Sequence, residues 1–197
     1  VSKVNAFVKH TNHREIVIAP DGGITETSTL TLENTARDNE PGVGGPYRTY
    51  IRFFLPLDAS VSDVTLDGVP VPSREAKALT PPTLPYIERV EAPQTVQGIG
   101  VALEVAPGTN RRLRISYSRG VRIAAGREAV FDLLQYKQAG LQDVAQTITI
   151  HFPVFWRATD ETGFTAGGKQ TVVAKDGELE YNTTLFTDVL LRVRFTK

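Results

Sequence analysis

The chain has 197 residues, and its 22 basic side chains balance its 22 acidic ones. A balanced charge creates no overall attraction to nucleic acid or to an anionic membrane surface, so we expect no nucleic-acid partner. The chain has no cysteine, which excludes a disulfide framework, a thiolate metal site and a cysteine nucleophile within it.

The amino-terminal part is predicted to form short strands joined by tight turns. Asp21-Gly22-Gly23 provides the positive φ angles of a hairpin turn between strands at 14–20 and 24–33. In the second of these strands apolar residues alternate with threonines, which is typical of a strand with one buried face. Asp67-Gly68 predicts another hairpin of the same kind.

The run Tyr47–Pro56 is the densest aromatic and β-branched stretch of the chain, and proline bounds it at both ends. Bulky side chains fall on both faces of the strand it predicts: Ile51, Phe53 and Leu55 on one, and Tyr50, Arg52 and Phe54 on the other. We therefore expect a central strand that is covered on both faces, with Phe53 buried.

Residues 73–95 differ from the rest because they are rich in proline. Ser73 is a candidate N-cap for one or two helical turns over 73–79, which Pro81 and Pro82 would end. The segment is either an internal boundary or a crossover between two sheets. We expect residues 1–197 to form one compact β-sandwich region.

The remaining part again predicts short strands with turn residues between them and almost no helical periodicity. The expected strands are 96–105, 113–117, 121–123, 130–136, 147–152, 169–174, 178–181 and 189–195. About a dozen short strands at this spacing predict an all-β fold, an immunoglobulin-like β-sandwich of antiparallel strands with hairpins and little helix.

Several stretches resemble, in the same order, the carboxy-terminal part of bacterial proteins grouped as family of unknown function 4012 (DUF4012). The similar stretches are 47–56, the hairpin around 21–23, 105–108 with 113–117, and 131–140, which contains Lys137-Gln138-Ala139-Gly140. Tyr136 departs from the family pattern, which has a less bulky residue before that lysine. The resemblance covers nearly the whole chain, from about Arg14 to Phe195.

The resemblance implies a large protein with an amino-terminal membrane anchor and with this region outside the cytoplasm, at the cell surface or in the envelope. The absence of methionine, even at position 1, agrees with a piece of a longer chain. We therefore expect contact with a membrane only through an anchor outside this sequence. The family brings no established activity and no catalytic residues.

Six arginines lie within 17 residues that contain no acidic residue: Arg111, Arg112, Arg114, Arg119, Arg122 and Arg127. Guanidinium groups bind phosphate or carboxylate through two hydrogen bonds, so Arg112, Arg114, Arg119 and Arg122 are candidate ligands for an anionic polymer. The alternative is a solvated sheet face paired with acids elsewhere. Trp156 is a candidate for stacking on a sugar, although a tryptophan beside a phenylalanine is more often part of a core.

No catalytic or metal-binding motif stands out. His10 and His13 are read as part of a solvated loop, no Gly-x-Ser-x-Gly motif accompanies His151, and no loop has the acidic spacing of a calcium site. The glycines at 42–45 precede a predicted strand, whereas a phosphate-binding loop precedes a helix.

The sequence therefore predicts a protein that is not an enzyme and needs no cofactor and no metal. We expect an extracytoplasmic structural or interaction module of a larger membrane-anchored envelope protein, with a protein or an envelope polymer as its partner. The alternative is a module that binds carbohydrate or an anionic glycopolymer.

Overall fold

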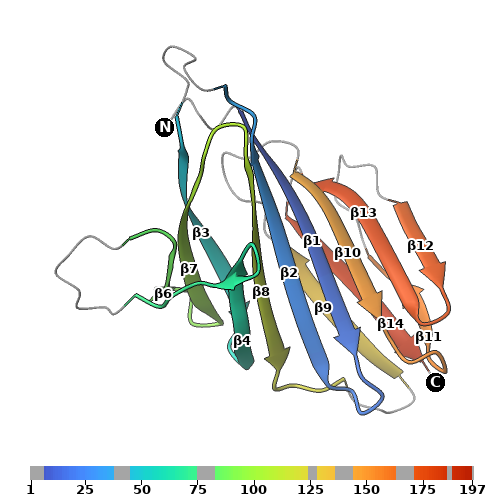
Figure 1. Cartoon of the computed structure of the whole chain (residues 1–197). Coiled ribbons are helices and arrows are strands. Elements are labelled where there is room, and N and C mark those ends of the chain that lie inside the picture. The colour runs from blue at the N-terminus through green and yellow to red at the C-terminus, as the bar shows by residue number, and fades with distance from the viewer. Residues whose placement is uncertain are drawn as a thin grey trace. The chain divides into compact units, whose positions relative to one another are not determined.

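The computed structural model describes residues 7–37, 45–74, 83–123, 128–135, 144–162, 171–185 and 188–196. The regular elements in these ranges are strands (Figure 1), which confirms the predicted all-β class. Their bounds are β1 Val8–Ile18, β2 Ile24–Asn34, β3 Tyr47–Pro56, β4 Ala59–Leu66, β5 Val69–Pro70, β6 Tyr86–Val90, β7 Val96–Val105, β8 Asn110–Arg119, β9 Glu128–Gln135, β10 Val144–His151, β11 Arg157–Asp160, β12 Thr171–Lys175, β13 Glu178–Leu185 and β14 Val189–Thr196. In the described part of the chain no helix is long and apolar enough to cross a membrane.

The strands fall into two compact units. The first unit comprises residues 1–10 and 29–115, and the second comprises residues 11–28 and 116–197. Strands β1, β2 and β8 contribute residues to both units. The described residues of the proline-rich segment, 73–74 and 83–95, belong to the first unit.

The second unit packs two sheets around an apolar core. One sheet has the order β12-β13-β10-β1-β2-β8 within this unit, and the other has the order β11-β14-β9. Strands β1 and β10 run parallel, whereas β10 with β13, β12 with β13, β11 with β14 and β14 with β9 pair antiparallel. The core lies between the two sheets because alternate residues of each strand point inward. It includes Ile16, Ile150, Tyr181, Val193 and Phe195.

The first unit contains the three-stranded sheet β3-β7-β6, together with its share of β1, β2 and β8 and the hairpin β4-β5. Strand β7 is the middle strand, and most of its side chains are buried. The buried residues of this unit include Leu32, Ile51, Val101, Leu103 and Leu113.

The predicted Asp-Gly turns are present. Gly22 and Gly68 have φ angles of 82° and 81°, a region that glycine enters without steric cost. A side chain at Gly22 would also collide with the backbone of Ile123, whose N–H donates to the Gly22 carbonyl. Both turns therefore depend on glycine, as the sequence indicates.

Two expectations about Tyr47–Pro56 are wrong in detail. Strand β3 is an end strand of its sheet, because β7 is the one described strand with which it pairs. Ile51 and Leu55 are buried, whereas Phe53 is only half-buried. Ser73 forms an isolated bridge with Ile87, and most of the helical turns predicted after it, like the Lys137–Gly140 stretch, lie outside the described residues.

Candidate functional site

One face of the sheet β3-β7-β6 in the first unit combines aromatic and arginine side chains. Residues of β3, β7 and β6 lie in register across the sheet, so that Arg52 is opposite Gly100, which is opposite Glu88. We call this surface the aromatic–arginine face, and it comprises Tyr50, Arg52 and Phe54 of β3, Tyr86 and Glu88 of β6, and Arg74 beside β6.

Small residues of the middle strand form the floor of this face. Gly98 and Gly100 of β7 have no side chain there, so the longer side chains of both neighbouring strands can lie over the strand. A Cβ atom at Gly100 would overlap the Tyr50 hydroxyl and would lie 2.8 Å from Val90 Cγ1. A Cβ atom at Gly98 would lie 2.6 Å from Val90 Cγ2. Tyr50 and Val90 therefore cover the two glycines.

A hydrogen bond across the floor joins the outer strands. Tyr50 Oη donates to Glu88 Oε1 at 2.8 Å, and Arg74 Nη1 donates to Glu88 Oε2 at 3.4 Å. Partial burial, followed by the nearby Glu88 carboxylate, raises the pKa of Tyr50 to about 12. The phenol is therefore a neutral donor at physiological pH.

The face carries an excess positive charge. Arg48 pairs with Glu104 at 2.7 Å, and Arg74 pairs with Glu88. The Arg52 guanidinium lies 5.7 Å from the centre of the Tyr50 ring, and it forms no ion pair with any residue the structure describes. Phe54 beside it is 40% exposed. Within the described part of the chain, the face thus presents a guanidinium without an ion-pair partner next to an exposed ring.

The predicted arginine cluster does not form one surface. Arg112 and Arg114 are exposed on β8, opposite the buried Leu113 and Ile115, as strand alternation predicts. Neither guanidinium has an ion-pair partner within the described ranges. The other members lie elsewhere, because Arg111 pairs with Asp67, Arg122 pairs with Asp21, Arg119 points into the second unit toward Glu26, and Arg127 is outside the described residues.

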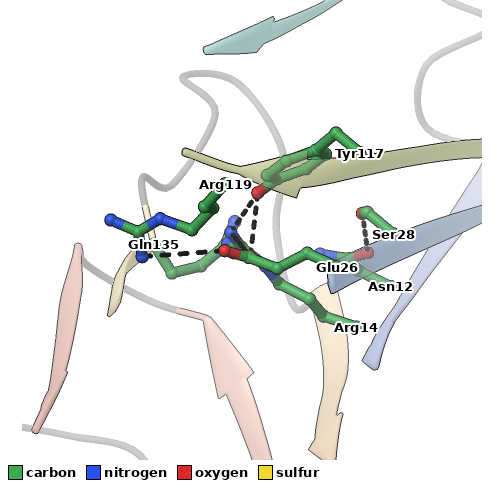
Figure 2. Close-up of polar contacts among 7 residues, drawn as sticks. All are labelled: Asn12, Arg14, Glu26, Ser28, Tyr117, Arg119 and Gln135. Atoms are coloured by element: carbon green, nitrogen blue, oxygen red, sulfur yellow. Dashed lines mark hydrogen bonds and ion pairs between the residues drawn. The ribbon is translucent and has the colours of Figure 1, made fainter. Parts of the chain in front are cut away.

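Arg119 belongs to a buried polar cluster between the sheets of the second unit (Figure 2). Glu26 of β2 is 1% exposed. Its Oε2 atom accepts hydrogen bonds from Arg14 Nη2 at 2.6 Å and from Tyr117 Oη at 2.8 Å. Arg14 Nη1 also donates to Gln135 Oε1 at 3.3 Å. The Glu26 carboxylate and the Arg14 guanidinium therefore link four strands, β1, β2, β8 and β9, by hydrogen bonds.

The charges of this cluster favour a structural role. Burial lowers the pKa of Arg14, but the Glu26 carboxylate and its hydrogen bonds outweigh burial and raise it. Burial raises the pKa of Tyr117, and Glu26 adds to that increase. Arg119 Nη1 lies 3.8 Å from Glu26 Oε1, which accepts no hydrogen bond from the described residues. The arginine is thus held as a counter-charge to a buried acid and is not presented at the surface.

Trp156 lies in the core of the second unit and is 5% exposed. Its ring packs against Phe195 at 5.8 Å and against Phe155 at 6.4 Å between ring centres. Stacking on a sugar requires an open ring face, and these contacts fit the core alternative.

The histidines do not gather into a metal site. Among the described residues no group of three or more His, Cys, Asp or Glu side chains is placed to hold a metal ion. His10 and His13 lie on strand β1, and the predicted loop is wrong. His10 is buried in the first unit, edge-on to Tyr47. His151 lies 3.5 Å from Glu15 and 3.6 Å from Glu178.

Sequence reasoning missed the aromatic–arginine face. The alternation of Tyr50, Arg52 and Phe54 is visible in the sequence, and so are Gly98 and Gly100. Their juxtaposition depends on the pairing of β3 with β7, for which the sequence gives no register.

No family model and no curated protein matches the chain. Among solved structures, a candidate nutrient-binding protein from Legionella pneumophila is similar, with a TM-score of 0.56 and 10% identity over 95% of this chain. A zinc metallopeptidase of the M1 group from Deinococcus radiodurans has a TM-score of 0.41 and 15% identity over 95% of this chain. A candidate protease from Parabacteroides distasonis has a TM-score of 0.47 and 13% identity over 98%.

The chain spans 67% of the Legionella protein, and 42% and 41% of the other two. At 10% identity the similarity to the Legionella protein shows a shared β fold and nothing about function. The other two similarities are too weak to support a conclusion about this chain.

Proposed function

We propose that the chain is a non-catalytic interaction module of a larger extracytoplasmic protein, anchored in a bacterial envelope, and that it binds a protein partner through the aromatic–arginine face. The observation that carries this proposal is the Arg52 guanidinium, which forms no ion pair with the described residues, beside the exposed Phe54 ring. Tyrosine, phenylalanine and arginine are enriched at the centres of protein interfaces, where a few such side chains supply most of the binding free energy.

Internal contacts prepare this face for binding. Arg74 lies 5.4 Å from the centre of the Tyr86 ring, as Arg52 lies over Tyr50. The hydrogen bond from Tyr50 to Glu88 fixes one of these rings. Side chains that are already ordered lose less conformational entropy on binding, which favours affinity.

The extracytoplasmic location rests on the resemblance to the DUF4012 proteins and is tested separately. The chain has no cysteine, so a single Thr25→Cys substitution at an exposed position of β2 creates one reactive thiol in the full-length protein. A maleimide that cannot cross membranes should label this thiol in intact cells. Labelling only after cell lysis would contradict the location.

The interaction is tested by purifying the tagged full-length protein from its own cells. Arg52→Glu and Phe54→Ala should each remove the co-purifying partner, whereas the paired substitution Arg112→Ala and Arg114→Ala should retain it. Both arginines of the control are exposed on β8, so the control changes charge without touching the face. If the partner is lost from the control protein but still co-purifies with Arg52→Glu, the partner does not bind at the aromatic–arginine face.

A second candidate function is binding of an anionic glycopolymer through Arg112 and Arg114. The observation that favours it is the exposure of both guanidiniums, without an acidic partner in the described part of the chain. Co-sedimentation with a teichoic-acid-type polymer separates the two functions. Binding that is lost when Arg112 and Arg114 are replaced by alanine supports the second candidate, and absence of binding to the wild type removes it.

A further inference from the structure

The free edge of strand β3 has the features of a docking edge for an added strand. Strand β3 pairs with β7 along Tyr47–Pro56 and with no other described strand. Every second residue of an antiparallel end strand directs its N–H and C=O groups away from the sheet. These groups form no backbone hydrogen bonds with the other residues that the structure describes.

The opposite edge of the same sheet is closed. Beside β6, Arg74 N donates to Ile87 O at 2.7 Å and Ile87 N donates to Pro72 O at 2.9 Å. An isolated parallel bridge joins Ser73 to Ile87 at this place. The segment around Ser73 thus covers β6 at Ile87, and β3 is the side of the sheet beside which no described strand pairs.

Strand β3 also lacks most of the usual protection of an end strand. Such strands are commonly short, or carry charged residues, above all lysine, or internal proline, which discourage pairing with other chains. Strand β3 has 10 residues, contains no lysine, and has proline only as its last residue, and its charged residues are Arg48 and Arg52. The other end strands are shorter, with 2 residues in β5, 5 in β6, 8 in β9, 4 in β11 and 5 in β12.

The charge of the neighbouring face indicates what the added strand carries. A strand beside β3 would lie about 4.8 Å away and would place alternate side chains opposite Arg52 and its neighbours on that face. Arg52 has no carboxylate partner among the described residues, whereas Arg48 on the same strand pairs with Glu104. An acidic side chain in the added strand would complete the pair.

We propose that β3 is the docking edge for an extended acidic peptide segment of the partner, which adds to the sheet β3-β7-β6 as a further strand. Main-chain hydrogen bonds along β3 supply affinity, and Arg52 selects a segment that has an acidic residue opposite it. A segment with an acidic residue at every second position places one there in each register on this face. This inference rests on the proposed interaction function and specifies how that interaction is made.

The probe is an eight-residue peptide with glutamate at every second position and valine between, labelled with a fluorophore and titrated into the full-length protein. Two N-methylated forms of it, with methyl groups on alternate sets of backbone nitrogens, test the strand hydrogen bonds. One form should bind like the parent and the other should lose binding, because only one set of N–H groups can face β3. Equal binding of both forms would overturn strand addition.

Charge selection is tested by a swap. Arg52→Glu should weaken binding of the glutamate peptide about tenfold or more and improve binding of the same peptide with lysine in place of glutamate. Arg112→Glu on β8 is the matched control and should leave both affinities unchanged. Equal effects of the two substitutions would show attraction by overall charge only and would overturn the assignment to Arg52.

Hydrogen exchange locates the peptide. Bound peptide should protect amides of β3 and leave those of β12 unchanged, and protection at β12 or at no strand would overturn the proposal. The peptide tests can fail while a partner still co-purifies with the wild type and is lost in Arg52→Glu. That result would reject strand addition but keep the interaction module. If the peptide tests fail and no partner co-purifies through Arg52, the interaction module is rejected as well.

Discussion

The Tyr50 hydroxyl lies 2.8 Å from Glu88 Oε1, and the two side chains meet across β7 where Gly100 has no side chain. This contact ties the two outer strands of a three-stranded sheet together on the surface that carries Arg52 and Phe54. The aromatic–arginine face therefore depends on the glycine beneath the Tyr50 hydroxyl.

Gly100→Ala should displace Tyr50, because the new Cβ atom would overlap the Tyr50 hydroxyl. Overpacking of this kind costs about 1–3 kcal/mol in the free energy of unfolding. Urea denaturation measures the cost. Tyr50→Thr removes the overlapping atoms, so Gly100→Ala should cost less in the Tyr50→Thr background than in the wild type. Equal costs in the two backgrounds would show that Tyr50 does not fill this space.

Tyr50 should make stability sensitive to high pH. Its pKa is raised from 10.0 to about 12 in the folded chain, so the fold favours the neutral phenol. That stabilisation is complete below the unfolded pKa and is lost as the pH rises through the folded pKa. Urea midpoints at pH 9 and pH 11 should therefore differ more for the wild type than for Tyr50→Phe. If the urea midpoint changes equally with pH in the wild type and in Tyr50→Phe, Tyr50 is not the source of the pH sensitivity.

Glu26→Gln should be among the most damaging substitutions in the second unit. It leaves the buried Arg14 guanidinium without its counter-charge, and breaking a buried pair in this way costs about 3–5 kcal/mol. Arg119→Gln is the matched control, because its Nη1 lies 3.8 Å from Glu26 and its side chain is 20% exposed. It should cost less than Glu26→Gln, because the nearest carboxylate atom, Glu26 Oε1, accepts no hydrogen bond from the described residues. Equal losses in thermal denaturation would mean that Arg119 is the true partner of Glu26.

Trp156 should report the core of the second unit by fluorescence, because it is the one tryptophan of the chain. A ring that is 5% exposed should emit at short wavelength, resist quenching by iodide and shift to longer wavelength on unfolding. Trp156→Ala should cost about 3–5 kcal/mol. Efficient quenching in the folded protein would reopen its candidacy as a sugar-stacking residue.

Much of the architecture follows from local patterns in the sequence. Asp21-Gly22 and Asp67-Gly68 predict their turns because the required φ angles are nearly restricted to glycine and its neighbours. Alternation in β8 correctly separates Arg112 and Arg114 from Leu113 and Ile115. These features depend on a few consecutive residues, so the sequence contains all the necessary information.

The sequence does not predict which strands pair when they lie far apart in the chain. The bulk on both sides of Tyr47–Pro56 suggests a central strand, but β3 is an end strand among the described strands. On its even-numbered side Tyr50 covers Gly100 of β7, and Arg52 and Phe54 are exposed. Phe53 is half-buried, so Phe53→Ala should cost about 1–3 kcal/mol, below the range for a fully buried phenylalanine. The Glu26 cluster likewise joins residues as far apart as Arg14 and Gln135, which no local pattern connects.

The most direct test of the interaction function places a photo-reactive phenylalanine analogue at position 54 of the full-length protein in its own cells. Phe54 is 40% exposed, so the analogue should be accepted without loss of stability. Irradiation should give one discrete cross-linked product from position 54, which Arg52→Glu abolishes, and none from the exposed position Thr25 of β2. Absence of a cross-link at position 54, or the same product from both positions, would contradict a partner on the aromatic–arginine face.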